Sequence, residues 1–188
     1  MGILPNKNVL IIIPKSQFCE EELCGLRSAL KRRGVHVVVL SKSGQETRGM
    51  KQNKFQPDGM VVDWNKQRGV QGKYHAVVLI GGKGAKKSLW DDQIIPQILT
   101  DHYRAGSVIG AMGSALVVLV RAALVTGEIP LPNDRDAREE LESLGAVCVD
   151  TPVISLGSMV FGQGADFVDG FSQTILDLIE VGDIPKKI

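Results

Sequence analysis

Short apolar runs that alternate with helix-like segments are the strongest constraint on what this chain can fold into. Residues 9–13 read V-L-I-I-I without a polar interruption, and largely apolar runs follow at 35–40, 75–80 and 107–111. Continuous apolar runs of this length suit strands that are buried on both faces, as in a parallel sheet. Between the first two runs, residues 20–33 carry apolar side chains at helical spacing. A strand, a helix and a second strand in this order predict a right-handed βαβ unit.

The same alternation continues to the end of the chain. Helices are expected at 92–103, from the end of the fourth run to about residue 123, and at 134–144 and 165–179, with short strands at 147–149, 153–155 and 159–161. This order predicts a three-layer α/β/α sandwich around a mostly parallel sheet. In such folds ligands bind beyond the carboxyl ends of the strands.

The chain length of 188 residues predicts a single domain, 1–188, with its core over residues 7–180. The polar segment 41–73 contains one short apolar stretch and is expected to form a small β excursion, for which a hairpin is the simplest form. Residues 181–188 are expected to form a tail.

Charge and cysteine content limit the classes of partner. The net charge of +1 gives no electrostatic reason to expect nucleic acid or an acidic membrane surface as a partner. The first apolar run is too short to span a membrane. Cys19, Cys24 and Cys148 are an odd number, which favours a reducing compartment and therefore a cytoplasmic protein. The cysteines and histidines lack the spacing of metal ligands, so no metal or cofactor is expected.

The third run ends in Gly81-Gly82-Lys83-Gly84. Glycines directly after a strand let backbone N–H groups approach a ligand closely. The spacing of a P-loop is missing. Two interpretations remain open, a tight turn between strand and helix or a loop that binds an anion or oxyanion.

The fourth run ends at a corner between a strand and a helix, Gly110-Ala111-Met112-Gly113-Ser114. Many α/β enzymes hold their nucleophile at such a corner. The sequence predicts Met112 as the corner residue, and a thioether has no proton to lose and is a poor nucleophile. Ser114 lies two residues further on and is expected to cap the helix rather than to attack a substrate.

Cys19 and three acids, Glu20, Glu21 and Glu22, follow the first run at the predicted start of a helix. Acids in a first helical turn complement the helix dipole without any catalytic role. Alternatively, one of these side chains reaches across the strand ends toward Met112. A cysteine at a helix N-terminus can have a lowered pKa, which would make Cys19 redox-active; the other interpretation is a small buried apolar residue.

Over residues 7–180 the chain resembles the DJ-1/PfpI (ThiJ) superfamily. The segments that carry the resemblance are 9–13 (VLIII), 18–23 (FCEEEL), 76–84 (AVVLIGGKG), 108–116 (VIGAMGSAL) and 160–167 (VFGQGADF). The resemblance implies a flavodoxin-like sandwich and a homodimer. It also implies a reactive cysteine at the corner, a glutamate on the first helix and often a nearby histidine. Activities assigned across the superfamily include peptidase, glyoxalase or deglycase, chaperone and oxidative-stress sensor.

Matched residue by residue, the chain departs from the pattern that the resemblance implies. Met112 takes the cysteine position and Gly113 the histidine position. Cys19 takes the position of the glutamate, and Glu22 that of a later, structural acid. If this segment is aligned with the family pattern one residue further along, Glu20 takes the position of the glutamate instead.

Three functions follow as hypotheses. The first is a binding, regulatory or stress-related dimer without cysteine catalysis, with a small-molecule ligand near Gly81, Gly82 and Gly113. The second is a hydrolase or redox sensor that uses Cys19 with Glu20 or Glu22. The third is an enzyme without covalent chemistry, in which the backbone N–H groups of Gly82 and Gly113 stabilise an oxyanion.

Overall fold

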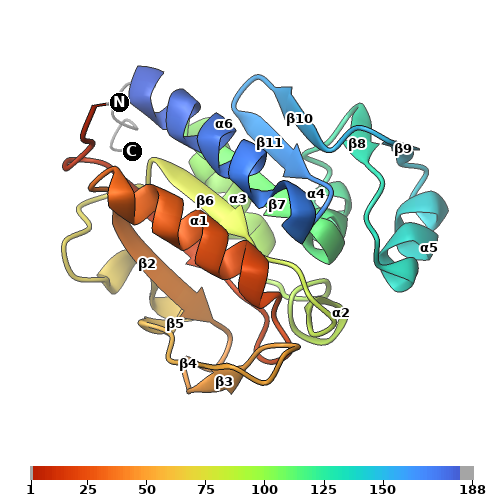
Figure 1. The fold of residues 1–188 in the computed structure, drawn as a ribbon, viewed down its shortest axis with the longest axis horizontal. Coiled ribbons are helices and arrows are strands. Elements are labelled where there is room, and N and C mark those ends of the chain that lie inside the picture. The colour runs from red at the N-terminus through yellow and green to blue at the C-terminus, as the bar shows by residue number, and fades with distance from the viewer. Residues whose placement is uncertain (1, 183–188) are drawn as a thin grey trace.

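The computed structural model describes residues 2–182, which form a seven-stranded central sheet flanked by helices (Figure 1). Neighbouring strands in this sheet are parallel except β10 and β11, which confirms the predicted mostly parallel α/β fold. From residue 183 on, the expected tail lies outside the described residues. Across the sheet the order is β10 (Val153–Leu156), β11 (Met159–Gly162), β7 (Val108–Met112), β6 (Ala76–Leu79), β1 (Asn8–Ile12), β2 (His36–Ser41) and β5 (Gly59–Met60).

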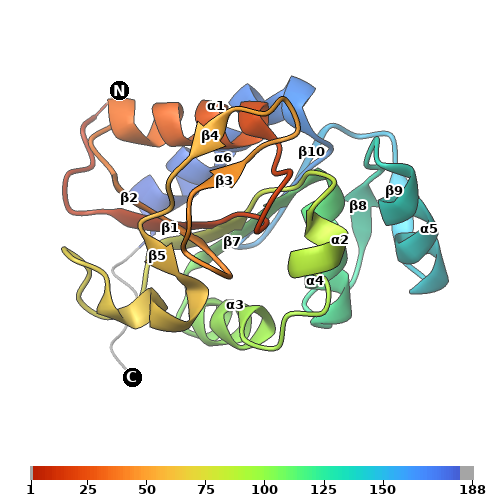
Figure 2. The ribbon, with the colours of Figure 1, turned by 90° about the horizontal axis from the view of Figure 1, so that it is seen from below.

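Helices cover both faces of this sheet, as Figure 2 shows. On one face α1 (Glu20–Arg32) packs against α6 (Val168–Val181), and on the other lie α3 (Ile95–Arg104) and α4 (Leu116–Arg121). Within residues 2–182, no helix combines the length and the apolar composition that crossing a membrane requires.

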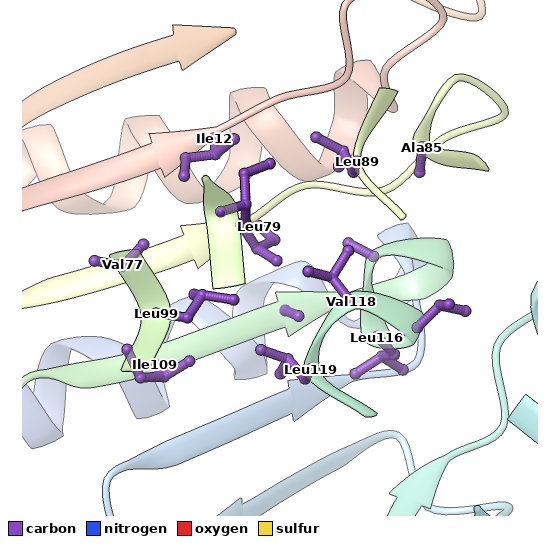
Figure 3. Close-up of a cluster of buried hydrophobic side chains, with 14 of the residues drawn as sticks. Ile12, Val77, Leu79, Ala85, Leu89, Leu99, Ile109, Leu116, Val118 and Leu119 are labelled. Atoms are coloured by element: carbon purple, nitrogen blue, oxygen red, sulfur yellow. The ribbon is translucent and has the colours of Figure 1, made fainter. Parts of the chain in front are cut away.

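The continuous apolar runs supply side chains to two separate cores. Because successive side chains of a strand point to opposite faces, Val9 and Ile11 pack beneath α1 and α6, while Leu10 and Ile12 pack toward α3 and α4. Figure 3 shows the second core, in which strand residues such as Leu79 meet helix residues such as Leu119. Both faces are therefore buried, which is why these strands show no polar alternation.

Residues 41–73 leave the sheet and return to its edge. β3 (Thr47–Arg48) and β4 (Lys54–Phe55) pair as an antiparallel hairpin, and β5 is followed by the 3-10 helix η1 (Val61–Lys66). The hairpin lies near the start of α1, where Phe18 forms a parallel bridge with Gly49. This excursion thus contributes to the end of the molecule at which β1 terminates.

Several short elements were not expected from the sequence. β8 (Glu128–Pro130) pairs with β9 (Val147–Val149) in a separate two-stranded sheet, connected through α5 (Arg135–Ser143). α2 (Ala85–Ser88) forms a single turn after the double glycine. Two of the expected helices begin with 3-10 turns, η2 (Gly113–Ala115) before α4 and η3 (Ala165–Phe167) before α6. The residues of β8 and α2 are too few to give a periodic signal.

Candidate ligand-binding site

A pocket of about 430 Å³ opens at the carboxyl ends of the central strands, where folds of this class bind ligands. We call it the strand-end pocket. Its walls come from six separate segments: the start of α1, the β3–β4 hairpin, the turn after β6, the turn after β7, the approach to α5 and the turn after β11. Its lining residues are Cys19, Glu22, Met50, Gly82, Lys83, Gly113, Ser114, Asn133, Asp134, Arg135, Gln163, Gly164 and Ala165.

The corner residue is Gly113, which corrects the prediction of Met112. Met112 has an extended backbone (φ −125°, ψ 146°) and is the last residue of β7, whereas Gly113 has φ +53°. A left-handed backbone favours glycine because other residues carry a Cβ that clashes. The Met112 side chain is fully buried in the core beneath α1 and α6, together with Phe171, and it does not line the pocket. Met112 is thus a core residue.

Glu22 is the acid of the pocket. Its side chain is buried, and its Oε2 accepts a 2.8 Å hydrogen bond from the backbone N–H of Gly81. Its Oε1 lies 3.0 Å from the point where a Cβ on Gly113 would stand, and 4.0 Å from the corresponding point on Gly164. Burial raises the pKa of Glu22 to about 7, and the Gly81 N–H offsets part of this increase. The carboxyl is therefore largely protonated below neutral pH, beside a corner that has no side chain.

Cys19 precedes α1 and lines the pocket, but its thiol is not activated. Its Sγ lies 3.7 Å from Oε2 of Glu21, to which it donates a weak hydrogen bond. Burial, together with the neighbouring charge of Glu22, raises the pKa of Cys19 to about 12. Desolvation of the thiolate outweighs the helix dipole here, which favours the interpretation of Cys19 as a small buried residue over that of a thiol with a lowered pKa.

Glu20 points away from the pocket and anchors the hairpin. Its Oε1 accepts hydrogen bonds from the backbone N–H groups of Lys51 (2.8 Å) and Asn53 (3.4 Å). Gly49 leaves room for this carboxyl, since a Cβ there would lie 2.0 Å from the Glu20 carboxyl carbon. Of the acids considered, Glu22 and not Glu20 therefore lies at the pocket.

Ser114 ties the two neighbouring turns together. Its hydroxyl accepts the N–H of Gly82 at 3.0 Å and donates to the carbonyl oxygen of Gly82 at 2.8 Å. The N–H groups of Gly81 and Gly82 are thus both occupied, by Glu22 and Ser114, and the expected oxyanion donor at Gly82 is not free for a ligand.

The double glycine instead permits close backbone approach, which favours the tight-turn interpretation. A Cβ on Gly81 would lie 2.8 Å from the carbonyl oxygen of Met112. Gly82 has φ +121°, and a Cβ there would lie 2.4 Å from the carbonyl oxygen of Gln17. The turn after β6 therefore shapes the site by bringing the ends of β1, β6 and β7 together.

Charged residues form the rim of the strand-end pocket. Asp134 caps α5 by accepting the N–H of Ala137 at 2.8 Å, and Arg135 pairs with Glu139 at 2.7 Å. Lys83 is exposed and has no carboxylate within salt-bridge distance among residues 2–182. The pocket lining therefore includes one lysine without a carboxylate partner in the described part of the chain, the carboxylate of Asp134 and the buried carboxyl of Glu22.

No histidine lies beside this pocket in the described part of the chain. His36 and His75 line a hollow of about 600 Å³ at the opposite end of the strands, and His102 is fully buried. The neighbouring histidine that the resemblance implies is thus missing.

Sequence reasoning did not identify Lys83, Arg135 or Gln163 as pocket residues. Arg135 and Gln163 come from segments far along the chain, and no local pattern connects them to the corner. A signal for the corner itself did exist, because Gly113 directly follows the apolar run and glycine is the residue most suited to a left-handed backbone.

Comparisons with known proteins agree with this architecture. The sequence model of the DJ-1/PfpI family matches residues 7–178. An uncharacterized protein of Methanocaldococcus jannaschii is 29% identical over 181 residues, which cover 94% of this chain and 84% of that protein. A ThiJ/PfpI domain protein from Brachyspira murdochii has a similar structure, with a TM-score of 0.82 at 17% identity over 97% of this chain and 100% of that one. DJ-1beta from Drosophila melanogaster gives a TM-score of 0.75 at 21% identity over 96% of this chain and 95% of that one.

Proposed function

This chain belongs to the DJ-1/PfpI family, and from that premise we propose that it binds a small molecule in the strand-end pocket without the family's cysteine-dependent catalysis. Its role is then that of a binding, regulatory or stress-related protein. The observation that carries the proposal is the corner: Gly113 has the left-handed backbone of a nucleophile position but offers only hydrogen where a side chain would approach Glu22. Covalent catalysis at this point has no attacking atom.

The alternative hydrolase or redox sensor would need Cys19 as its nucleophile. That thiol is buried, its pKa is raised to about 12, and its closest acids, Glu21 and Glu22, disfavour the thiolate further. A nucleophilic cysteine acts as the thiolate. These features favour the binding function over the cysteine-dependent one.

A thiol titration of the native protein at pH 6 tests the absence of cysteine chemistry. Cys24 is exposed, so the experiment uses a Cys24→Ser background, in which we expect no fast-reacting thiol. Rapid labelling of Cys19 would instead support the redox or hydrolase function.

Activity assays test the rest of the proposal. We expect negligible turnover of methylglyoxal and of chromogenic peptides. Turnover that survives Cys19→Ser but is lost in Glu22→Gln would overturn the binding-only function and indicate an enzyme that uses Glu22 for proton transfer.

Two further properties are proposed with this function. A homodimer is expected from membership of the family, and a cytoplasmic location from the odd number of cysteines. Fractionation of cells that express a tagged form checks the location.

A further inference from the structure

The Glu22 carboxyl has one satisfied oxygen and one that opens into the strand-end pocket. Oε2 is held by the N–H of Gly81, while Oε1 has no hydrogen-bond partner among residues 2–182 and faces the side-chain-free space between Gly113 and Gly164. The residue is only 3% exposed. Because this oxygen opens into the pocket and is not used by the described residues, it can form a hydrogen bond with a molecule that enters. Oε1 is therefore the atom of Glu22 that is available to a ligand.

The groups around Glu22 decide the charge of that ligand. On α1 the neighbours are the Cys19 thiol and Glu21, and Glu21 pairs with Lys51. From the other walls, the titratable or charged groups that line the pocket are Lys83, Asp134 and Arg135. Asp134 is engaged by the N-terminus of α5 and Arg135 by Glu139. Among the described residues, Lys83 is therefore the lining cation without a carboxylate partner, while Asp134 keeps its negative charge beside the N-terminus of α5.

We propose that the strand-end pocket binds a small carboxylate monoanion, whose oxygen shares a proton with Oε1 of Glu22 and whose charge is balanced by Lys83. This inference rests on the proposed binding function. A carboxylate accepts a short, charge-assisted O–H···O bond from a carboxylic acid. Lys83 has no carboxylate partner in the part of the chain that the structure describes and can pair with a ligand carboxylate, and the pocket volume of about 430 Å³ holds a ligand of metabolite size.

Binding of this kind is linked to protons. The complex contains one proton, which stays between the two carboxyl groups, and no covalent bond forms or breaks. Above the pKa of Glu22, about 7, the free protein must take up a proton before the anion binds, because two ionised carboxylates repel each other. The apparent affinity then falls about tenfold for each pH unit above that value.

The experiment is a titration followed by the backbone amide NMR signals of Gly81, Gly113 and Gly164. The probes are acetate, pyruvate and benzoate, each compared with its neutral amide (acetamide, pyruvamide and benzamide) at pH 6 and pH 8. We expect at least one carboxylate to shift these signals, to bind about tenfold more weakly at pH 8 than at pH 6, and to bind more tightly than its amide.

Variants separate the two contacts. Glu22→Gln keeps a hydrogen-bond donor but does not titrate, so its carboxylate affinity should be equal at pH 6 and pH 8. Lys83→Met should weaken binding severalfold at both pH values. Lys87→Met is the matched control, because Lys87 is an exposed lysine of α2 outside the pocket, and it should bind as the unmodified protein does.

The outcomes distinguish the two levels of the proposal. If an amide binds as tightly as its carboxylate, or if carboxylate binding does not depend on pH, the ligand class is wrong while small-molecule binding stands. If neither these probes nor a fragment collection shifts the pocket signals, the proposed binding function fails as well.

Discussion

At position 113 a hydrogen atom stands where a side chain would meet Glu22. The residue before it, Met112, is the one that sequence reasoning placed at the corner. The difference is a single step along the chain, but it moves the thioether from the site into the core and leaves the site open. An apolar run does not reveal the residue at which a strand ends, because buried strand residues and buried corner residues have the same composition.

Cysteines placed at the two neighbouring positions distinguish these assignments. In the Cys24→Ser background, we expect Gly113→Cys to be labelled by a thiol reagent in the native protein and Met112→Cys only after unfolding. The new side chain at 113 requires Glu22 to give way slightly, since its Cβ would lie 3.0 Å from Oε1. Labelling at 112 but not at 113 would restore Met112 as the corner residue.

The raised pKa of Glu22 makes the stability of the protein depend on pH. Between its ordinary value of 4.5 and about 7, the folded protein holds one more proton than the unfolded chain, so stability falls as pH rises through this window. Across the whole window, the free energy of unfolding falls by about 3 kcal/mol.

Glu22→Gln, which cannot ionise, should therefore be as stable as the unmodified protein at pH 4 and more stable at pH 8. Urea unfolding at both pH values measures the difference. Glu21→Gln is the control. The side chain of Glu21 is 40% exposed, and its hydrogen bond to Lys51 lowers the pKa of Glu21 below its ordinary value instead of raising it. An unchanged pH profile in Glu22→Gln would contradict the buried, protonated carboxyl.

At the scale of elements, the turn after β6 holds the strand ends at contact distance. Gly82→Ala should lower the free energy of unfolding by about 3–5 kcal/mol. The substitution places an alanine at a positive φ, and its Cβ would lie 2.4 Å from the carbonyl oxygen of Gln17. Gly106→Ala is the matched control: φ is +86°, but nothing lies within 4 Å of its Cβ, so it should cost about 1–2 kcal/mol. If urea unfolding gives the same loss of unfolding free energy for both variants, the contact between residue 82 and the carbonyl oxygen of Gln17 does not add to the destabilisation.

Glu20 is one of the contacts that hold the β3–β4 hairpin to the rest of the molecule, beside the backbone pairing of Phe18 with Gly49. We expect Glu20→Ala to speed hydrogen exchange at the amides of Lys51 and Asn53, because both lose their acceptor. Exchange in β2 should not change, and Glu21→Ala should leave both amides protected. If the two amides exchange at their original rates, Glu20 does not protect them.

The elements that sequence reasoning found are those with long, uniform signals. The run at 9–13 and the periodic residues of α1 and α6 were recognised because burial on both faces, or on one helical stripe, leaves a pattern in the sequence. β8 was missed because its three residues are a glutamate, an isoleucine and a proline, whereas β9 has the same length but reads V-C-V. The acid of the pocket was left open between Glu20 and Glu22 because both follow the first apolar run, and only the contacts of each carboxyl show which one faces the corner.

For the whole molecule, membership of the family leads to a prediction about assembly. We expect a particle of twice the chain mass of 20.3 kDa in light scattering coupled to size-exclusion chromatography, across a range of protein concentrations. A mass equal to one chain at every concentration would refute the homodimer. The pocket is built within one chain, so its ligand binding should not depend on the outcome.

The bare corner at Gly113 has a consequence for how the protein responds to its surroundings. Peroxide and electrophilic aldehydes attack thiolates, and the corner has no sulfur to attack. Under oxidative conditions that would modify a relative with a reactive thiol at that position, this corner should stay chemically unchanged, and the sulfur atoms of the pocket are those of Cys19 and Met50 in its walls. As long as these two side chains stay reduced, occupancy would report the local acidity and the abundance of the ligand.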